Sequence, residues 1–186
     1  MKICIFYYDG FCEFEVVLSA LIFRDNHFTV ALENRVYISE EKQKYLPDKT
    51  IDELNPDEID LFIIPGGNPK YLYTNLKLKN FINELNKRNK FVAGICAGTY
   101  LMARYGLLKG KRCTGDSSGL QENKEYIDLF KDAVITKEDV VVDGNIVTST
   151  GQAFIEFTFE LCKLMGIYEN NDEALMDYRW FKNIKQ

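Results

Sequence analysis

Hydrophobic and polar positions along the chain form two alternating patterns. Short apolar runs such as Ile3–Tyr8 and Ile59–Ile64 are typical of strands buried on both faces of a sheet. Longer segments with apolar residues three and four positions apart, such as Gln152–Met165, predict amphipathic helices. Val140–Thr148 predicts a hairpin, because Asp143-Gly144 is a favoured two-residue turn. The other predicted strands are Phe28–Leu32, Phe91–Ile95 and a short one near Cys113, and the other predicted helices are Phe11 to about Arg24, Leu76–Arg88, a helix after Cys96 to about Leu108, Gln121–Lys131 and Asp172–Phe181.

Strands that alternate with helices predict an α/β fold with a mostly parallel sheet covered by helices on both faces. The 186 residues show no repeat, low-complexity stretch or linker, so residues 1–186 are expected to form one domain. The polar segment Glu33–Pro56 interrupts the alternation and is expected to hold at most a small hairpin. Sheets of this kind bind ligands at the edge where strands end and helices begin.

Composition narrows the classes of function. The net charge is −5 and no basic stripe is present, which argues against nucleic acid as a partner. No apolar run is long enough for a secretory signal or a membrane span. The five cysteines are scattered and the chain has one histidine, so neither a disulfide framework nor a metal or cofactor is expected. A cytoplasmic protein that acts on a small molecule fits these observations.

Cys96 is the most informative residue. It lies in Gly94-Ile95-Cys96-Ala97-Gly98, between a predicted strand and a predicted helix, which is the layout of a nucleophile elbow. The first turn of the following helix supplies free N–H groups and a positive dipole end, which favour a reactive thiolate. The competing interpretation is an inert buried cysteine; the flanking glycines favour the reactive one.

Glu15 is the second candidate. It falls on the apolar stripe of the first predicted helix, with Phe11, Phe14, Leu18 and Ile22. Partial burial should raise its pKa, so that it could hold a proton near neutrality and pass it to a thiolate or a substrate. The competing interpretation is a carboxylate that only complements the helix dipole.

Two backbone N–H groups at the same edge complete the candidate site. Gly67 follows the predicted strand ending at Ile64, and Ala97 follows the nucleophile. Together their N–H groups could form an oxyanion hole beside the Cys96 sulfur. Gly66-Gly67 can also be read as a plain turn.

A family resemblance rests on four motifs that occur in order along nearly the whole chain. They are Phe14-Glu15-Val16-Val17, Ile64-Pro65-Gly66-Gly67-Asn68, Ala93-Gly94-Ile95-Cys96-Ala97-Gly98, and Val147-Thr148-Ser149-Thr150-Gly151 followed by Phe154 and Glu156-Phe157. With these motifs the chain resembles the ThiJ/PfpI family of the class I glutamine-amidotransferase-like superfamily, which includes the Parkinsonism-associated deglycase.

The resemblance implies a flavodoxin-like three-layer α/β/α sandwich, usually a homodimer. It implies that Cys96 is the nucleophile, Glu15 its carboxyl partner, and Gly67 and Ala97 the oxyanion hole. The activities that it implies include deglycase, cofactor-free glyoxalase, amidase or peptidase, isonitrile hydratase and oxidative-stress sensing.

The chain departs from the family at the partner histidine. Peptidase-like members have His directly after the nucleophile, where this chain has Ala97, and deglycase-like members bring a His from later in the chain. The one histidine, His27, precedes the second strand and is expected at the opposite edge of the sheet. Proteolysis is therefore not expected. By rough alignment Asp132 lies near the missing His, and Asp116, Ser117 and Ser118 are other candidates to line the pocket.

These features leave two classes of function. The first is a thiol-dependent enzyme of the amidase, hydrolase or deglycase type on a small carbonyl or amide compound. The second is a non-catalytic redox sensor that works through oxidation of Cys96. The isonitrile hydratase-like branch needs no His, but it typically has Asp at the position of Glu15 and Thr at that of Ala97. A structural role with an inert Cys96 also stays open.

Overall fold

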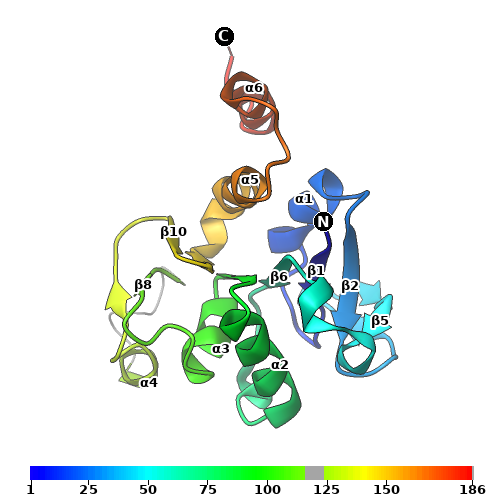
Figure 1. The fold of residues 1–186 in the computed structure, drawn as a ribbon, viewed down its shortest axis with the longest axis vertical. Helices are drawn as coiled ribbons and strands as arrows, with labels where there is room; N and C mark the ends of the chain where they lie inside the picture. Colours follow the sequence, from blue (N-terminus) through cyan, green and yellow to red (C-terminus); the bar gives the residue numbers. More distant parts are fainter. Residues whose placement is uncertain (116–123, 186) are drawn as a thin grey trace.

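Seven short strands form the central sheet, the β layer of the molecule (Figure 1). The computed structural model describes residues 1–115 and 124–185. Neighbouring strands are parallel except at one edge, where β10 and β11 form the antiparallel hairpin that the Asp-Gly turn predicts. In spatial order the strands are β10 (Val140–Asp143), β11 (Ile146–Ser149), β7 (Phe91–Ile95), β6 (Leu61–Ile64), β1 (Ile3–Phe6), β2 (His27–Ala31) and β5 (Lys49–Thr50).

Burial explains the composition of the inner strands. Every residue of β1, β6 and β11 is buried, as expected of parallel strands covered on both faces. The chain runs from β1 outward to β2 and then returns to β6 on the other side of β1. The strand order therefore reverses between β1 and β6. Ligands of such sheets bind outside the carboxyl ends of the strands at this reversal.

Helices cover both faces of the sheet and make the three-layer α/β/α sandwich that the resemblance implies (Figure 1). On one face α1 packs on α5, and Ser19 Oγ lies 2.8 Å from Thr158 Oγ1 in a hydrogen bond between them. On the other face lie α2 and α3, with α4 beside α3. The bounds are α1 (Phe14–Ile22), α2 (Leu76–Lys87), α3 (Gly98–Arg104), α4 (Lys124–Leu129), α5 (Phe154–Leu164) and α6 (Asn171–Phe181).

Smaller elements connect these layers. Two strands form the predicted hairpin inside Glu33–Pro56, whereas β5 was not predicted there. The hairpin strands are β3 (Tyr37–Ile38) and β4 (Lys44–Tyr45); a parallel pair is formed by β8 (Arg112–Cys113) and β9 (Val134–Ile135); and the 3-10 turns are η1 (Ile51–Glu53), η2 (Pro56–Glu58), η3 (Lys70–Leu72) and η4 (Gly151–Ala153).

The first helix begins three residues later than predicted. Phe11 pairs with Gly67 in an isolated antiparallel bridge, and the Cys12 N–H donates to the Gly66 carbonyl at 2.9 Å. These contacts hold residues 11–12 in extended conformation, so α1 starts at Phe14. The helix after Cys96 ends at Arg104, ahead of the predicted Leu108, and Gly106 follows it with φ +86°. Glycine adopts that backbone conformation without steric cost.

The stripe on which we placed Glu15 is only partly correct. Phe11 lies outside α1, and Phe14 is 48% exposed. The buried residues of the helix are Glu15, Val16, Leu18 and Ser19. Glu15 is indeed buried, but on the face that packs against the sheet edge and α5, while Phe14 lies at the surface. The spacing of apolar residues alone therefore predicted the wrong set of buried residues for this helix.

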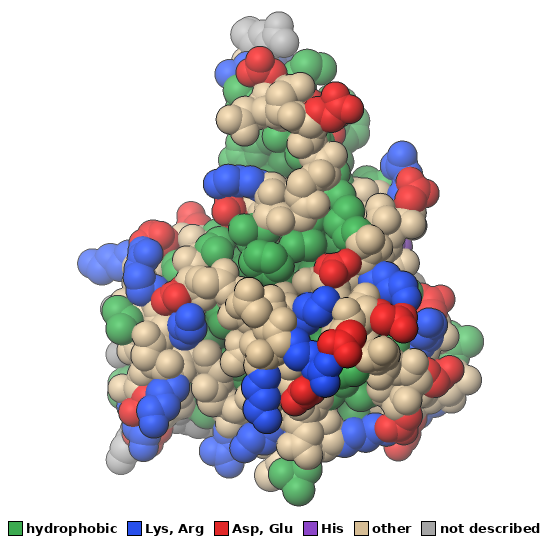
Figure 2. All heavy atoms as spheres, viewed as in Figure 1, with side chains coloured by type: hydrophobic (Ala, Val, Ile, Leu, Met, Phe, Trp, Pro, Cys, Tyr) green, Lys and Arg blue, Asp and Glu red, His purple; other side chains and the backbone are tan. Residues whose placement is uncertain are grey.

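Helix α6 projects from the body of the molecule and rests on α5 (Figure 1). It has no buried residue, and Trp180 is 76% exposed. Figure 2 shows apolar side chains gathered around α5 and the base of α6, with mixed charges over the rest of this face. Among the described helices, none combines the length and apolar character that a membrane span requires.

Candidate active site

Cys96 occupies a strained turn between β7 and α3. Its φ is +52°, a value that L-residues other than glycine seldom adopt. The turn is held on both sides, because the Cys96 N–H donates to Ser149 O of β11 at 2.9 Å and its carbonyl accepts from Thr99 Oγ1 at 2.6 Å. The thiol is partly exposed. The chain therefore has the nucleophile-elbow geometry, with a strained residue that stays in place because its surroundings over-determine it.

The glycines on either side of the elbow are required by close packing. A Cβ on Gly94 would lie 2.3 Å from Met102 Sδ, and one on Gly98 would lie 2.3 Å from Ile64 O. Both distances are far below van der Waals contact. The two glycines of the motif around Cys96 are thus required because β7, α3 and β6 pack closely together here.

The Glu15 carboxyl lies directly against the elbow. Its side chain is 1% exposed, its Oε2 accepts from the Gly66 N–H at 2.6 Å, and it shares a hydrogen bond with the Cys96 thiol. Burial raises the pKa of Glu15 to about 7, although the bonds from Gly66 and Cys96 act in the opposite direction. Near neutral pH this carboxyl can therefore both give and take a proton beside the sulfur.

Two further glycines, which the sequence did not single out for this purpose, make room for the pair. A Cβ on Gly66 would lie 2.7 Å from both Cys96 Cβ and Glu15 Oε2. A Cβ on Gly151, at the start of η4, would lie 2.9 Å from Glu15 Oε1 and 3.2 Å from Cys96 Sγ. The Cys96 thiol and the Glu15 carboxyl can thus lie together because both of these positions lack a side chain.

Tyr8 supports this arrangement from the interior. It is 1% exposed, and its hydroxyl donates to Gly66 O at 2.5 Å and also approaches Pro65 O at 3.0 Å. Burial and the nearby Glu15 charge raise the pKa of this phenol well above its usual value. Tyr8 therefore stays a neutral donor and fixes the peptide whose N–H holds Glu15.

Gly67 and Ala97 both line the cavity that contains Cys96. Gly67 has φ +113°, and a Cβ there would lie 1.9 Å from Gly10 O. Within the described residues, neither Gly67 N–H nor Ala97 N–H donates to another protein group. The structure thus brings Cys96, Glu15, Gly67 and Ala97 together at one edge of the sheet.

The cavity has a volume of about 420 Å³ and suits a small molecule. Aromatic rings form much of its wall: Tyr100 stacks on Tyr126 at 4.2 Å between centroids, and Phe14 meets Phe154 edge-to-face at 5.6 Å. The described lining residues are Cys12, Phe14, Glu15, Glu40, Gly67, Asn68, Pro69, Lys70, Tyr73, Cys96, Ala97, Tyr100, Tyr126, Gly151, Gln152 and Phe154.

Sequence reasoning missed Cys12 and Glu40 in this cavity. The Cys12 thiol donates to Glu40 Oε2 at 2.9 Å. Burial, the hydrogen bond to Glu40 and the nearby Glu15 charge raise the pKa of Cys12 far above its usual value. The odd count of cysteines was a weak signal for Cys12, and nothing in the sequence marked Glu40.

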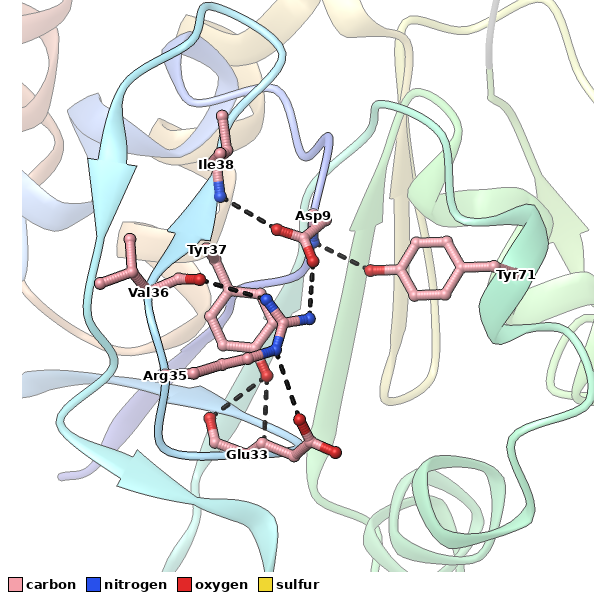
Figure 3. A network of polar contacts seen from close by, with 7 residues as sticks. All are labelled: Asp9, Glu33, Arg35, Val36, Tyr37, Ile38 and Tyr71. Atoms are coloured by element: carbon pink, nitrogen blue, oxygen red, sulfur yellow. Dashed lines mark hydrogen bonds and ion pairs between the residues drawn. The ribbon is translucent and has the colours of Figure 1, made fainter.

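A polar network fastens the β3–β4 hairpin that carries Glu40 (Figure 3). Asp9 receives a hydrogen bond from the Ile38 N–H at 3.1 Å and an ion pair from Arg35 at 2.6 Å. Arg35 also lies over the Tyr37 ring at 4.0 Å, and the Asp9 N–H donates to Tyr71 Oη at 2.9 Å. This network ties the hairpin to the loop after β1 and to η3.

Of the remaining predicted pocket residues, the structure describes Asp132 alone. Asp132 is exposed, is not among the described residues that line the cavity, and its carbonyl accepts from the Gly110 N–H at 2.7 Å. The chain after α4 turns toward β9 rather than toward Cys96, which is why the rough alignment misplaced it. Asp116, Ser117 and Ser118 lie outside the described residues.

His27 lies where the sequence predicts. It is the first residue of β2, so it lies at the amino end of a parallel strand, whereas Cys96 follows the carboxyl end of β7. Within residues 1–115 and 124–185, no cluster of three or more His, Cys, Asp or Glu side chains is arranged to hold a metal ion.

Comparison with curated proteins finds relatives along most of the chain. An uncharacterized protein of Methanocaldococcus jannaschii is 36% identical over 133 residues, which cover 69% of this chain and 62% of that protein. Deglycase PfpI of Pyrococcus furiosus is 35% identical over 108 residues, or 55% of this chain and 59% of that protein. The chain thus matches less than two thirds of the length of these two relatives. A protein of Thermococcus kodakarensis named as a deglycase is 29% identical and is matched over 80% of this chain and 89% of its own length.

Solved structures of other proteins share this fold. A thiJ/pfpI family protein from Bacillus anthracis superposes with a TM-score of 0.88 at 21% identity, over 99% of this chain and 91% of that one. A DJ-1 superfamily protein from Agrobacterium tumefaciens gives 0.83 at 28% identity, over 97% of each chain. The model of the DJ-1/PfpI family matches residues 1–164. The resemblance seen in the motifs is therefore confirmed: this chain belongs to the DJ-1/PfpI family.

Proposed function

We propose that this protein is a cysteine-dependent enzyme, of the deglycase or amidase type, that acts on a small carbonyl or amide compound. The observation that carries the proposal is the hydrogen-bonded pair of Cys96 and buried Glu15 in the cavity, with the pKa of Glu15 raised to about 7. The relatives named as deglycases support the same class of activity.

In the proposed reaction the Cys96 sulfur attacks the electrophilic carbon, and a C–S bond forms while the carbonyl electron pair moves to oxygen. The N–H groups of Gly67 and Ala97 would hold this developing oxyanion. Glu15 would receive the thiol proton and pass it to the amine nitrogen, so that the oxyanion re-forms the carbonyl, the C–N bond breaks and the amine leaves. Water would then release the acyl group from sulfur. A single carboxyl of pKa near 7 could perform both proton transfers, which accounts for the absence of a histidine beside Cys96.

A screen of small aldehyde adducts of amines and of simple amides tests this proposal. Cys96→Ser should lower kcat/KM by about 10³-fold or more, and Glu15→Gln by about 10²-fold or more. Cys113→Ser is the matched control, because Cys113 is a buried thiol of β8 that does not line the cavity. Equal activity of Cys96→Ser and Cys113→Ser would refute the enzyme proposal.

A redox-sensing role of Cys96 is the second candidate. Glu15 could hydrogen-bond an oxidised sulfur as readily as a thiolate, and the partly exposed thiol is open to small oxidants. Activity on none of the screened carbonyl compounds, with Cys96 the first cysteine to oxidise, would favour it. The homodimer and the cytoplasmic location expected from the sequence stay proposals.

A further inference from the structure

The cavity contains a second thiol–carboxyl pair that the proposed reaction does not use. Cys12 and Glu40 line the same cavity as Cys96 and Glu15. We name Cys96 and Glu15 the inner pair, and Cys12 and Glu40 the outer pair. In each pair a thiol is hydrogen-bonded to a carboxyl group, and both pairs lie near Gly66.

Gly66 brings the two cysteines close to each other. The Cys12 N–H donates to the Gly66 carbonyl at 2.9 Å, while Cys96 Cβ lies so near Gly66 that a Cβ on that glycine would be 2.7 Å from it. Cys12 belongs to the segment between β1 and α1, outside any helix or strand. For a disulfide to form, the Cys12 side chain would turn from Glu40 toward Cys96 by a change of rotamer, and the two Cα atoms would come within about 7 Å of each other.

We propose that Cys12 is a resolving cysteine: after a small peroxide has oxidised Cys96, Cys12 forms a disulfide with it. This inference needs a reactive Cys96 thiol but does not depend on the carbonyl chemistry proposed above. It adds a peroxide-reducing activity to the same cavity.

The proposed reaction has two steps. Glu15 takes the proton of the Cys96 thiol, and the sulfur attacks one peroxide oxygen. The O–O bond breaks, and the released hydroxide takes that proton from Glu15 to become water, which leaves a sulfenic acid on Cys96. Glu40 then accepts the proton of Cys12, whose sulfur attacks the Cys96 sulfur. The S–O bond breaks, and the hydroxyl leaves as water with the proton that Glu40 received. Two thiols lose two electrons, and one peroxide gains them.

The surroundings of the two thiols assign their order. Burial, the bond to Glu40 and the charge of Glu15 keep Cys12 protonated, so it does not react with peroxide first. Cys12 is 9% exposed, whereas Cys96 is partly open to the cavity. Glu40 is exposed and accepts the Cys12 S–H at 2.9 Å, so it can pass the proton on. The other charged or titratable groups near Cys12 include Glu15, Cys96 and Tyr8.

Peroxide titration of the reduced full-length protein, followed by intact-mass and peptide mass spectrometry, tests the proposal. The wild type should lose two hydrogens and yield a peptide that joins Cys12 to Cys96, and dithiothreitol should reverse this change. Cys12→Ser and Cys12→Ala should instead carry Cys96 on to sulfinic acid, with roughly tenfold more of this product than the wild type. Glu40→Gln should slow the cross-link without slowing the first oxidation.

Cys113→Ser serves as the matched control and should form the cross-link as the wild type does. The proposal is overturned if the wild type yields sulfinic acid without the cross-link, if Cys96 pairs with another cysteine, or if peroxide leaves Cys96 reduced. The first two outcomes leave the carbonyl chemistry of Cys96 intact, so failure here is distinguishable from failure of the proposed function, which the Cys96→Ser activity assay measures.

Discussion

The inner and outer pairs combine the same two groups, a thiol and a carboxyl, in different surroundings. The inner pair is enclosed by the ends of the sheet, with Glu15 1% exposed and glycines packed against it. The outer pair depends on the β3–β4 hairpin, and Glu40 is exposed. Burial and support, rather than residue type, therefore distinguish the thiol that we propose as the nucleophile from the thiol of Cys12.

The largest effect expected concerns the pH dependence of stability. Folding raises the pKa of Glu15 from 4.5 to about 7, so the folded state binds more protons than the unfolded state between these values. The contribution of Glu15 to the free energy of unfolding should therefore fall as the pH rises from 4.5 to 7, by up to about 3 kcal/mol. Urea titrations of the wild type and Glu15→Gln should show this fall in the wild type alone.

The control for this measurement is Glu13→Gln, which changes a carboxyl two residues away that accepts a hydrogen bond from Ser39 Oγ of the hairpin. It should keep the pH dependence of the wild type. An equal fall in Glu15→Gln would show that Glu15 is not the group whose titration destabilises the protein.

Next in size is the effect of filling the space around the inner pair. Gly151→Ala would place a methyl group 2.9 Å from Glu15 Oε1 and 3.2 Å from Cys96 Sγ, so the pair must separate. A shift of about 1 Å in a reacting group can lower activity about 10²-fold, and we expect kcat/KM to fall by that order. Gly166→Ala, in open space at φ +64°, should cost about 1 kcal/mol of stability and leave activity unchanged. Equal activities of the two variants would contradict the packing argument.

The support behind the inner pair should have a smaller effect. Tyr8→Phe removes the hydroxyl that donates to Gly66 O and leaves a buried carbonyl with one donor fewer. We expect the free energy of unfolding to fall by about 1–2 kcal/mol in urea titration. Tyr178→Phe, whose hydroxyl bonds Glu156 on α5 away from the cavity, should cost less. A larger loss of unfolding free energy in Tyr178→Phe than in Tyr8→Phe would contradict the supporting role of Tyr8.

The smallest effect concerns the outer pair. Arg35→Gln breaks the exposed ion pair with Asp9 and the contact of the guanidinium with the ring of Tyr37. Exposed pairs contribute about 0.2–1 kcal/mol, so the hairpin should open up to roughly fivefold more often. Alkylation of Cys12 should accelerate by that factor while that of Cys96 stays constant, as peptide mass spectrometry can measure. Lys182→Gln, which breaks an ion pair with Glu156, should change neither rate. Equal acceleration of both cysteines would mean that the hairpin supports the inner pair as well.

Prediction from the sequence worked where the signal was local. Gly94-Ile95-Cys96-Ala97-Gly98 predicted a strand, a sharp turn and a helix, and β7 has the predicted bounds. Glu15 was predicted to be partly buried, and it is almost fully buried, although the stripe used to argue this wrongly included exposed Phe14. Helical spacing fixes the direction of a side chain only when the helix start is known, and α1 began later because Phe11 and Cys12 bond the Gly66–Gly67 turn.

The sequence failed where distant segments meet. Asp132 was placed near the site by alignment alone, with no pattern to fix the path of the chain after α4. Cys12 and Glu40 stand 28 residues apart, and their contact depends on how the hairpin docks. No periodicity in either segment encodes that docking.

By itself, the sequence determined the alternation of strands and helices, the elbow at Cys96 and the family, because each of these depends on residues close together along the chain. The tertiary structure alone decided that Gly66 and Gly151 make room for the inner pair, and that Cys12 and Glu40 join the same cavity. The physical reason is that burial, close approach and pKa depend on which segments pack together in three dimensions.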